Sequence, residues 1–195
     1  MAIPTPRASH SLVYFKNMGV SGSFYMFGGG NFHQFFNDLF IFDISTRSWL
    51  LPSVSGEQPP APRAGHTATK IDESHFCVIG GGQPTTVFND IYLFNIVKNS
   101  WLRVTAAGHQ PERRCGHSAT LYDKKILIFG GGDVDGQMFG SVQSLDLSYM
   151  VCNQRKSTSK GVLPPPVILA QALDSPKREL DFSEDDRALS SNSKR

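Results

Sequence analysis

Short stretches of mixed apolar and polar residues, each bounded by turn residues, follow one another along the first three quarters of the chain. The middle of the chain holds four of them, at 66–71, 76–79, 91–94 and 100–104. They are rich in β-branched and aromatic residues, whereas Gly, Pro, Asn and Asp cluster between them. No stretch keeps a helical period over three turns. The pattern predicts an all-β fold of short antiparallel strands.

The same pattern occurs three times. Triple glycines begin at Gly28, Gly80 and Gly130, at offsets of 52 and 50 residues. An Arg-x-x-His motif precedes each glycine run, and a tryptophan closes the first two units. The recurring positions are Arg7, His10, Gly28, Gly29 and Trp49 in unit one, Arg63, His66, Gly80, Gly81 and Trp101 in unit two, and Arg114, His117, Gly130 and Gly131 in unit three. In unit three, Cys152 falls at the place of the tryptophan and the Asn-Asp pair is missing.

This combination of motifs resembles the kelch repeat, which has a period of about 50 residues. The resemblance covers roughly positions 4–150, in units at about 4–54, 55–107 and 108–150. It implies β-propeller blades of four antiparallel strands each. It also implies that the arginine and histidine are framework residues that bond to neighbouring strands and loops. The tryptophans are expected to pack between blades, where a large ring buries much apolar area.

Three four-stranded repeats are fewer than the roughly four to eight blades of a closed propeller, so we expect an incomplete ring over residues 1–150. Residues 151–195 are polar and have the composition of a disordered tail. Within that tail, Val167–Leu173 is an apolar run that we interpret as a linker or as a segment that folds on a partner. Three alternatives stay open: a shortened isoform, a truncated product without independent activity, or a chain that completes its ring by self-association.

The charge balance restricts the classes of partner, and the cysteine content indicates the cellular compartment. Eleven basic and eleven acidic residues precede position 150, which argues against a nucleic-acid partner because such a partner needs a basic face. No apolar run approaches the roughly 20 residues that span a membrane. The three cysteines form neither a zinc pair nor an even disulfide framework. They indicate a reducing compartment, and we expect the cytoplasm with the nucleus as the alternative.

Catalytic patterns are missing from the sequence. There is no Gly-x-Ser-x-Gly, and no Lys follows the glycine runs as in a phosphate-binding loop. The recurring histidines His10, His66 and His117 suggest a metal site only if they converge on the channel, and equivalent positions on successive blades stay apart. We therefore predict no catalytic residues, cofactor or metal. The alternative is a metal-dependent or redox enzyme of the kelch-propeller type, because some kelch-like propellers carry such a centre.

The loops that join the second and third strands differ between units, and propeller loops carry recognition. The residues predicted to bind a partner are His33, Gln34, Phe35, Thr85, Thr86, Asp133, Asp135, Gln137 and Met138. The segments linking the blades, 52–62 and 105–112, are expected at the same end. Phe32, Phe35 and Met138 either form an exposed hot spot or pack back on the blades. The predicted function is noncatalytic binding of a partner protein, as an adaptor or scaffold.

Overall fold

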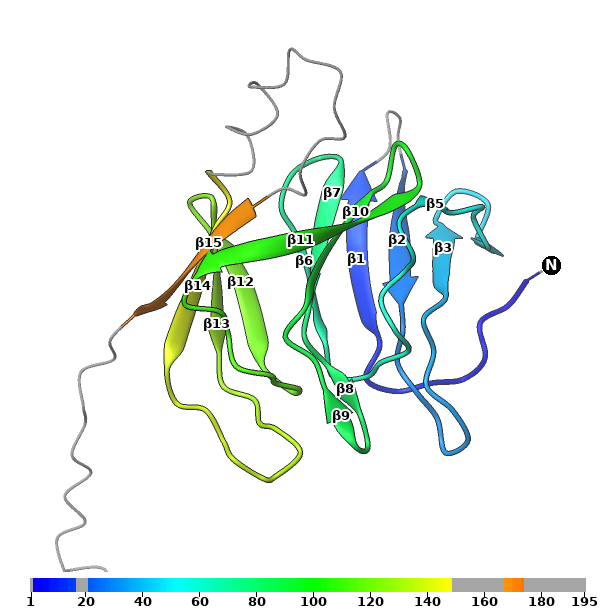
Figure 1. The fold of residues 1–195 in the computed structure, drawn as a ribbon. Coiled ribbons are helices and arrows are strands. Elements are labelled where there is room, and N and C mark those ends of the chain that lie inside the picture. The colour runs from blue at the N-terminus through cyan, green and yellow to red at the C-terminus, as the bar shows by residue number, and fades with distance from the viewer. Residues whose placement is uncertain (1, 17–20, 149–166, 174–195) are drawn as a thin grey trace, which may run out of the picture.

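The structure is a computed structural model that describes residues 2–16, 21–148 and 167–173. Its strands form three consecutive four-stranded blades that stand side by side (Figure 1). This arrangement confirms the predicted all-β propeller architecture. Within these described ranges, no helix is long and apolar enough to cross a membrane.

Blade 1 is an antiparallel sheet whose spatial order follows the chain. Its strands are β1 (Ser11–Lys16), β2 (Gly22–Phe27), β3 (Leu39–Asp43) and β4 (Ser48–Leu50). The link to the next blade contains the short strand β5 (Ser55–Gly56), which pairs in parallel with the start of the fourth strand of blade 2. The link therefore adds an outer edge to blade 2 before it reaches the first strand of that blade.

Blade 2 has the same order, with a small hairpin inserted in the loop between its second and third strands. The strands of the blade are β6 (Thr67–Lys70), β7 (His75–Ile79), β10 (Ile91–Asn95) and β11 (Ser100–Gly108). The hairpin consists of β8 (Gly82–Gln83) and β9 (Thr86–Val87). Figure 1 shows this hairpin at the same end as the corresponding loops of blades 1 and 3.

Blade 3 takes its fourth strand from the segment that the sequence assigned to the tail. Its strands are β12 (Ser118–Tyr122), β13 (Lys125–Phe129), β14 (Val142–Asp146) and β15 (Val167–Leu173). The predicted boundary at residue 150 is therefore wrong for these seven residues, because an apolar run with strand propensity pairs along the whole of β14. The remaining residues of the predicted tail lie outside the described ranges.

The link from blade 2 to blade 3 also differs from the prediction. Residues 105–108 continue β11 and pair in parallel with β15, so the two blades share one nine-stranded sheet. In Figure 1, β11 crosses from one blade to the other. Only the later part of the predicted linking segment, 109–112, is a connection without a regular strand.

Cross-strand pairing identifies the residue of blade 3 that stands where the other blades have tryptophan. Trp49 pairs with Phe42, and Trp101 pairs with Phe94. In blade 3 the equivalent pair is Ala170 with Leu145. The prediction that Cys152 occupies this place is therefore wrong, and Cys152 itself lies outside the described residues. The sequence interpretation expected the fourth strand soon after β14, at the spacing of the first two units, but β15 begins only at Val167.

The core lies between the blades. Strand β7 of blade 2 buries both of its faces, whereas β13 of blade 3 fully buries only the face that carries Ile126 and Ile128. Between blades 1 and 2 it is aromatic: Phe15, Tyr25, Phe27, Phe76, Phe94 and Trp101. Between blades 2 and 3 it is aliphatic: Cys77, Ile79, Ile91, Leu93, Ile126, Ile128, Leu145 and Ile168. This packing of blade on blade fixes the ends of the strands, and therefore the loops, relative to one another.

Candidate functional site

Each framework arginine ties down both ends of the loop between the second and third strands. Arg63 is fully buried and donates hydrogen bonds to the carbonyl oxygen of Gly80 (2.8 Å) and to Oδ2 of Asp90 (2.9 Å). Its guanidinium also stacks on the ring of Phe88, 4.3 Å from the centroid. Gly80 precedes the loop, and Phe88 and Asp90 follow it. One side chain thus holds the loop at its entry and at its exit.

Arg7 makes the same set of contacts in blade 1. It donates to the carbonyl oxygen of Gly28 at 3.1 Å and pairs with Asp38, and its guanidinium lies 3.8 Å from the ring centroid of Phe36. The three recurring contacts explain why arginine, glycine, phenylalanine and aspartate repeat together in the sequence. Bidentate pairing requires the planar guanidinium, so lysine does not substitute for it.

In blade 3, a glutamate from a different part of the chain takes the place of the missing aspartate. Ser141 stands where the other blades have Asp38 and Asp90, and the buried Arg114 instead donates to Oε2 of Glu112 at 2.5 Å. The amide of Gln143 donates to the same oxygen. Burial acts to raise the pKa of Glu112, but these hydrogen bonds and the nearby guanidinium hold it below its usual value. Glu112 therefore stays a carboxylate and neutralises Arg114.

Two of the recurring histidines lie in the joints between blades. Nε2 of His66 is 2.9 Å from Oγ of Ser11, and Nε2 of His117 is 3.0 Å from Oγ1 of Thr67. Burial, together with the adjacent arginine, lowers the pKa of His66 to about 3 and that of His117 to about 4. Both rings are therefore neutral and link neighbouring blades. In the part of the chain that the structure describes, no three His, Cys, Asp or Glu side chains are grouped to hold a metal ion.

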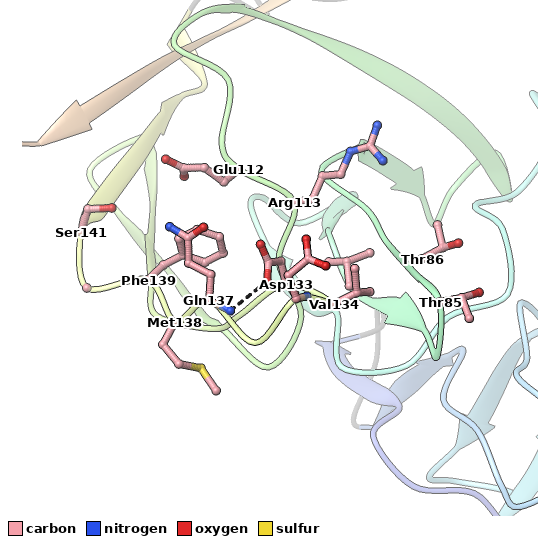
Figure 2. A pocket seen from close by; sticks show the side chains of 13 residues that line it. Thr85, Thr86, Glu112, Arg113, Asp133, Val134, Gln137, Met138, Phe139 and Ser141 are labelled. Atoms are coloured by element: carbon pink, nitrogen blue, oxygen red, sulfur yellow. Dashed lines mark hydrogen bonds between the residues drawn. The ribbon is translucent and has the colours of Figure 1, made fainter.

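The loops of blades 2 and 3 enclose a hollow of about 690 Å³ (Figure 2). Six of the residues predicted to bind a partner line it: Thr85, Thr86, Asp133, Asp135, Gln137 and Met138. They come from the hairpin β8–β9 and from the loop between β13 and β14. The structure thus brings together two loops that lie about 50 residues apart in the sequence.

The lining of the hollow is a mixture of polar and apolar groups, and its charged residues are mostly acidic. Asp133 accepts hydrogen bonds from the backbone amides of Asp135 (3.0 Å) and Gln137 (2.9 Å), which rigidifies the turn. Asp135 and Met138 are exposed, and 80% of Met138 is accessible to solvent. A rigid loop with a free carboxylate and an accessible thioether can bind a cationic group beside an apolar one.

The loop of blade 1 lines a second hollow of about 670 Å³ at the same end of the blades. His33 and Phe35 line it together with residues 5–9, whereas Gln34 lines neither of the two hollows. Phe32 is fully exposed at its rim. The predicted loop residues other than Gln34 therefore line two separate hollows, and the aromatic side chain of Phe32 does not pack back on the blade.

Several residues of the larger hollow were not predicted to bind a partner. They are Val87, Glu112, Arg113, Val134, Phe139, Gly140 and Ser141. Glu112 and Arg113 end the link that precedes β12, and Figure 2 shows them above the loop of blade 3. The sequence holds a signal for one of them, Glu112. Because unit three lacks the recurring aspartate, an acidic residue beside Arg114 is the natural replacement.

Comparisons with known proteins agree with the blade architecture. The family described as the KLHDC2/KLHL20/DRC7 Kelch-repeats domain matches residues 1–172, a range that includes most of β15. A Rho GTPase-activating protein, gacHH, of Dictyostelium discoideum is 37% identical over 128 residues, which are 62% of this chain and 8% of that protein. Kelch domain-containing protein 1 of Mus musculus is 35% identical over 101 residues, which are 51% of this chain and 25% of the relative.

A further relative carries the name of an enzyme. N-(sulfonatooxy)prop-2-enimidothioate sulfolyase of Thlaspi arvense is 29% identical over 133 residues, which are 66% of this chain and 36% of that protein. The chain thus spans between 8% and 36% of the lengths of these three relatives.

Proposed function

Because this chain belongs to the kelch-repeat family, we propose that it is a noncatalytic module that binds a partner protein through the loops of its blades. Kelch repeats generally mediate protein–protein interaction. The finer part of the proposal is the place of binding. The partner occupies the hollow between the loops of blades 2 and 3, and the adjacent loop of blade 1 extends the contact.

One observation carries the proposal most directly: loop residues of blades 2 and 3 that differ between the repeat units line one hollow. Thr86 and Met138 belong to different blades, yet both line it. The scaffold beneath is rigid, because Arg63 and Arg114 fix the ends of both loops. Variable side chains on a fixed frame are the usual arrangement of a recognition surface.

The chemistry of the hollow suggests the kind of segment that it binds. Carboxylates outnumber cations in its lining, with Glu112, Asp133 and Asp135 against Arg113. Glu112 is engaged by Arg114, so Asp135 is the carboxylate that is free for a partner. We therefore expect an extended segment with a Lys or Arg side chain for Asp135 and an apolar side chain for Met138.

The breadth of the relatives supports a module rather than one shared reaction. Proteins named as a GTPase-activating protein and as a sulfolyase share this segment, although it is a minor part of each. Loops differ readily on a common set of blades, so one scaffold serves many partners. This is the reason for proposing an adaptor or scaffold role.

The proposal is tested by selecting peptides from a random display library on the full chain and measuring their affinity by fluorescence anisotropy. Asp135→Asn and Met138→Ala should each weaken binding roughly tenfold, as loss of a central contact of about 1.4 kcal/mol does. Val97→Ala is the matched control. Val97 is 75% exposed in the turn between β10 and β11, at the opposite end of blade 2.

Two results would overturn the proposal. The first is a set of selected peptides whose affinity does not change in either loop variant. The second is equal weakening by Val97→Ala, which would place binding away from the loops. Circular dichroism of each variant separates a lost contact from a lost fold.

A further inference from the structure

The two joints between blades are built from the same contacts. In the first joint, Phe27 of blade 1 packs edge-on against the ring of His66 of blade 2, with centroids 5.3 Å apart. The amide of Gly29 donates to the carbonyl oxygen of Arg63 at 2.8 Å. His66 also reaches the hydroxyl of Ser11. Each blade thus offers an aromatic or aliphatic side chain, an amide and a hydroxyl to the histidine motif of the next blade.

The second joint repeats this arrangement one blade further on. The amide of Gly81 donates to the carbonyl oxygen of Arg114 at 2.9 Å, and His117 reaches the hydroxyl of Thr67. In both joints the histidine ring fills the space beside the first glycine. A Cβ atom on Gly28 would lie 2.9 Å from His66, and one on Gly80 would lie 3.0 Å from His117.

Blade 3 presents the same half of a joint with nothing described against it. Phe129 stands at the position of Phe27 but is 52% exposed, whereas Phe27 is fully buried. A Cβ atom on Gly130 would meet no described atom within 4 Å. Ser118, at the place of Ser11 and Thr67, is exposed. The place of the next histidine is therefore open among the described residues.

Blade 1 presents the complementary half. His10 is exposed, although its equivalents His66 and His117 are buried. The sheet face beside it is apolar: Leu12 is 51% exposed and Tyr14 is 45% exposed. Both residues lie on the face opposite to Val13, which packs toward blade 2.

The aromatic side chains on this face of blade 1 correspond to those that fill the joint in blade 2. Trp49 contacts Phe42 with ring centroids 5.1 Å apart, as Trp101 contacts Phe94 at 4.8 Å. Trp101 is only 2% exposed, whereas Trp49 is half-buried. The face that blade 2 buries against blade 1 is thus repeated on blade 1 with no described blade to cover it.

We propose that the outer face of blade 1 docks on the outer face of blade 3 of a second copy of this chain. His10 then takes the open place beside Gly130 and stacks on Phe129, and its Nε2 meets the hydroxyl of Ser118. A second copy is the occupant because the two halves of the joint are both present on this chain and are complementary. The pairing is reciprocal and closes six blades, within the range of about four to eight seen in propellers.

The test is the mass of the full chain in solution, measured by light scattering coupled to size exclusion over a range of concentrations. Wild-type protein should have twice the chain mass. Leu12→Lys and Phe129→Lys should each give a monomer, because both side chains are exposed on the separate chain and only the joint buries them. Val97→Lys, on a turn away from both faces, should remain a dimer.

Mixing the two variants identifies the mode of pairing. Leu12→Lys retains an intact blade 3 and Phe129→Lys retains an intact blade 1, so the mixture regains one native joint and should form a heterodimer. A wild-type monomer would overturn the proposal. A dimer that survives both substitutions, or a mixture that stays monomeric although each variant shows a β-rich circular dichroism spectrum, would do the same. Loss of the dimer in only one variant would indicate pairing of like faces and would also contradict it.

Discussion

Nε2 of His66 lies 2.9 Å from Oγ of Ser11, and this contact crosses from blade 2 to blade 1. The ring is buried, and burial together with Arg63 lowers the pKa of His66 to about 3. His117 repeats the contact in the next joint, and its pKa is lowered to about 4. Both joints therefore depend on an uncharged imidazole, whose ordinary pKa is 6.5.

From these pKa values we predict that the fold loses stability in mild acid. Below pH 6.5 the unfolded chain binds protons at both histidines, but the folded chain does not until about pH 4 or 3. The free energy of unfolding therefore falls as the pH falls, by up to about 1.4 kcal/mol per pH unit for each histidine. Urea unfolding at pH 7, 6 and 5 measures this slope. His117→Gln should reduce it, and an unchanged slope in that variant would contradict the assignment.

The sequence predicted the fold and the recurring framework residues well because both depend on local patterns. The period of the glycines and of the Arg-x-x-His motif marks the blades, and the continuous apolar run Phe76–Ile79 of β7 indicates a strand with two buried faces. The fourth strand of blade 3 was missed because it is separated from β14 by a long connection. Strand pairing across such a distance depends on the open edge of the sheet, which no local pattern reveals.

The residues that line the larger hollow were predicted less completely, for a related physical reason. Loop position could be predicted from the repeat, so Thr86 and Met138 were identified. Arg113 and Phe139 line the same hollow because the blades rotate their loops toward one another and the link passes between them. That convergence is a property of the packed blades and not of any single segment.

The place of β15 in the core leads to a second prediction. Ile168 is fully buried in the cluster between blades 2 and 3, and Ile→Ala changes at such positions cost about 2–5 kcal/mol. Ile168→Ala should therefore lower the midpoint of urea unfolding markedly. Leu173→Ala is the control, because Leu173 lies at the end of the same strand and is 41% exposed. Equal and small effects of both changes would contradict the pairing of β15 in the blade.

The burial of Cys77 leads to a third prediction, on thiol reactivity. Burial raises the pKa of the Cys77 thiol, which lies fully enclosed in the same core cluster. Cys115 is only half-buried. Alkylation followed by peptide mass spectrometry should label Cys77 roughly 100-fold or more slowly than Cys115, because labelling requires opening of the core. The difference should vanish in urea. Equal rates in the native protein would mean that the two blades do not pack as described.

The pairing of Arg114 with Glu112 leads to the last prediction, which includes a rescue. Arg114 is fully buried and donates to Oε2 of Glu112 at 2.5 Å, where the other two arginines pair with Asp38 and Asp90. Glu112→Gln removes the negative charge opposite a buried cation and should cost about 1–3 kcal/mol in urea unfolding.

Ser141→Asp restores a carboxylate at the position that the first two blades use. The double variant with Glu112→Gln should therefore regain most of the lost stability, because Arg114 can pair with the new carboxylate as Arg63 pairs with Asp90. Val97→Asp in the same background serves as the control, since Val97 is 75% exposed in the turn between β10 and β11, away from Arg114 and from both outer faces. If the control also restores the stability lost in Glu112→Gln, the effect is due to net charge. If only the variant with Ser141→Asp restores it, Glu112 neutralises the buried arginine of blade 3 as the aspartate does in the other two blades.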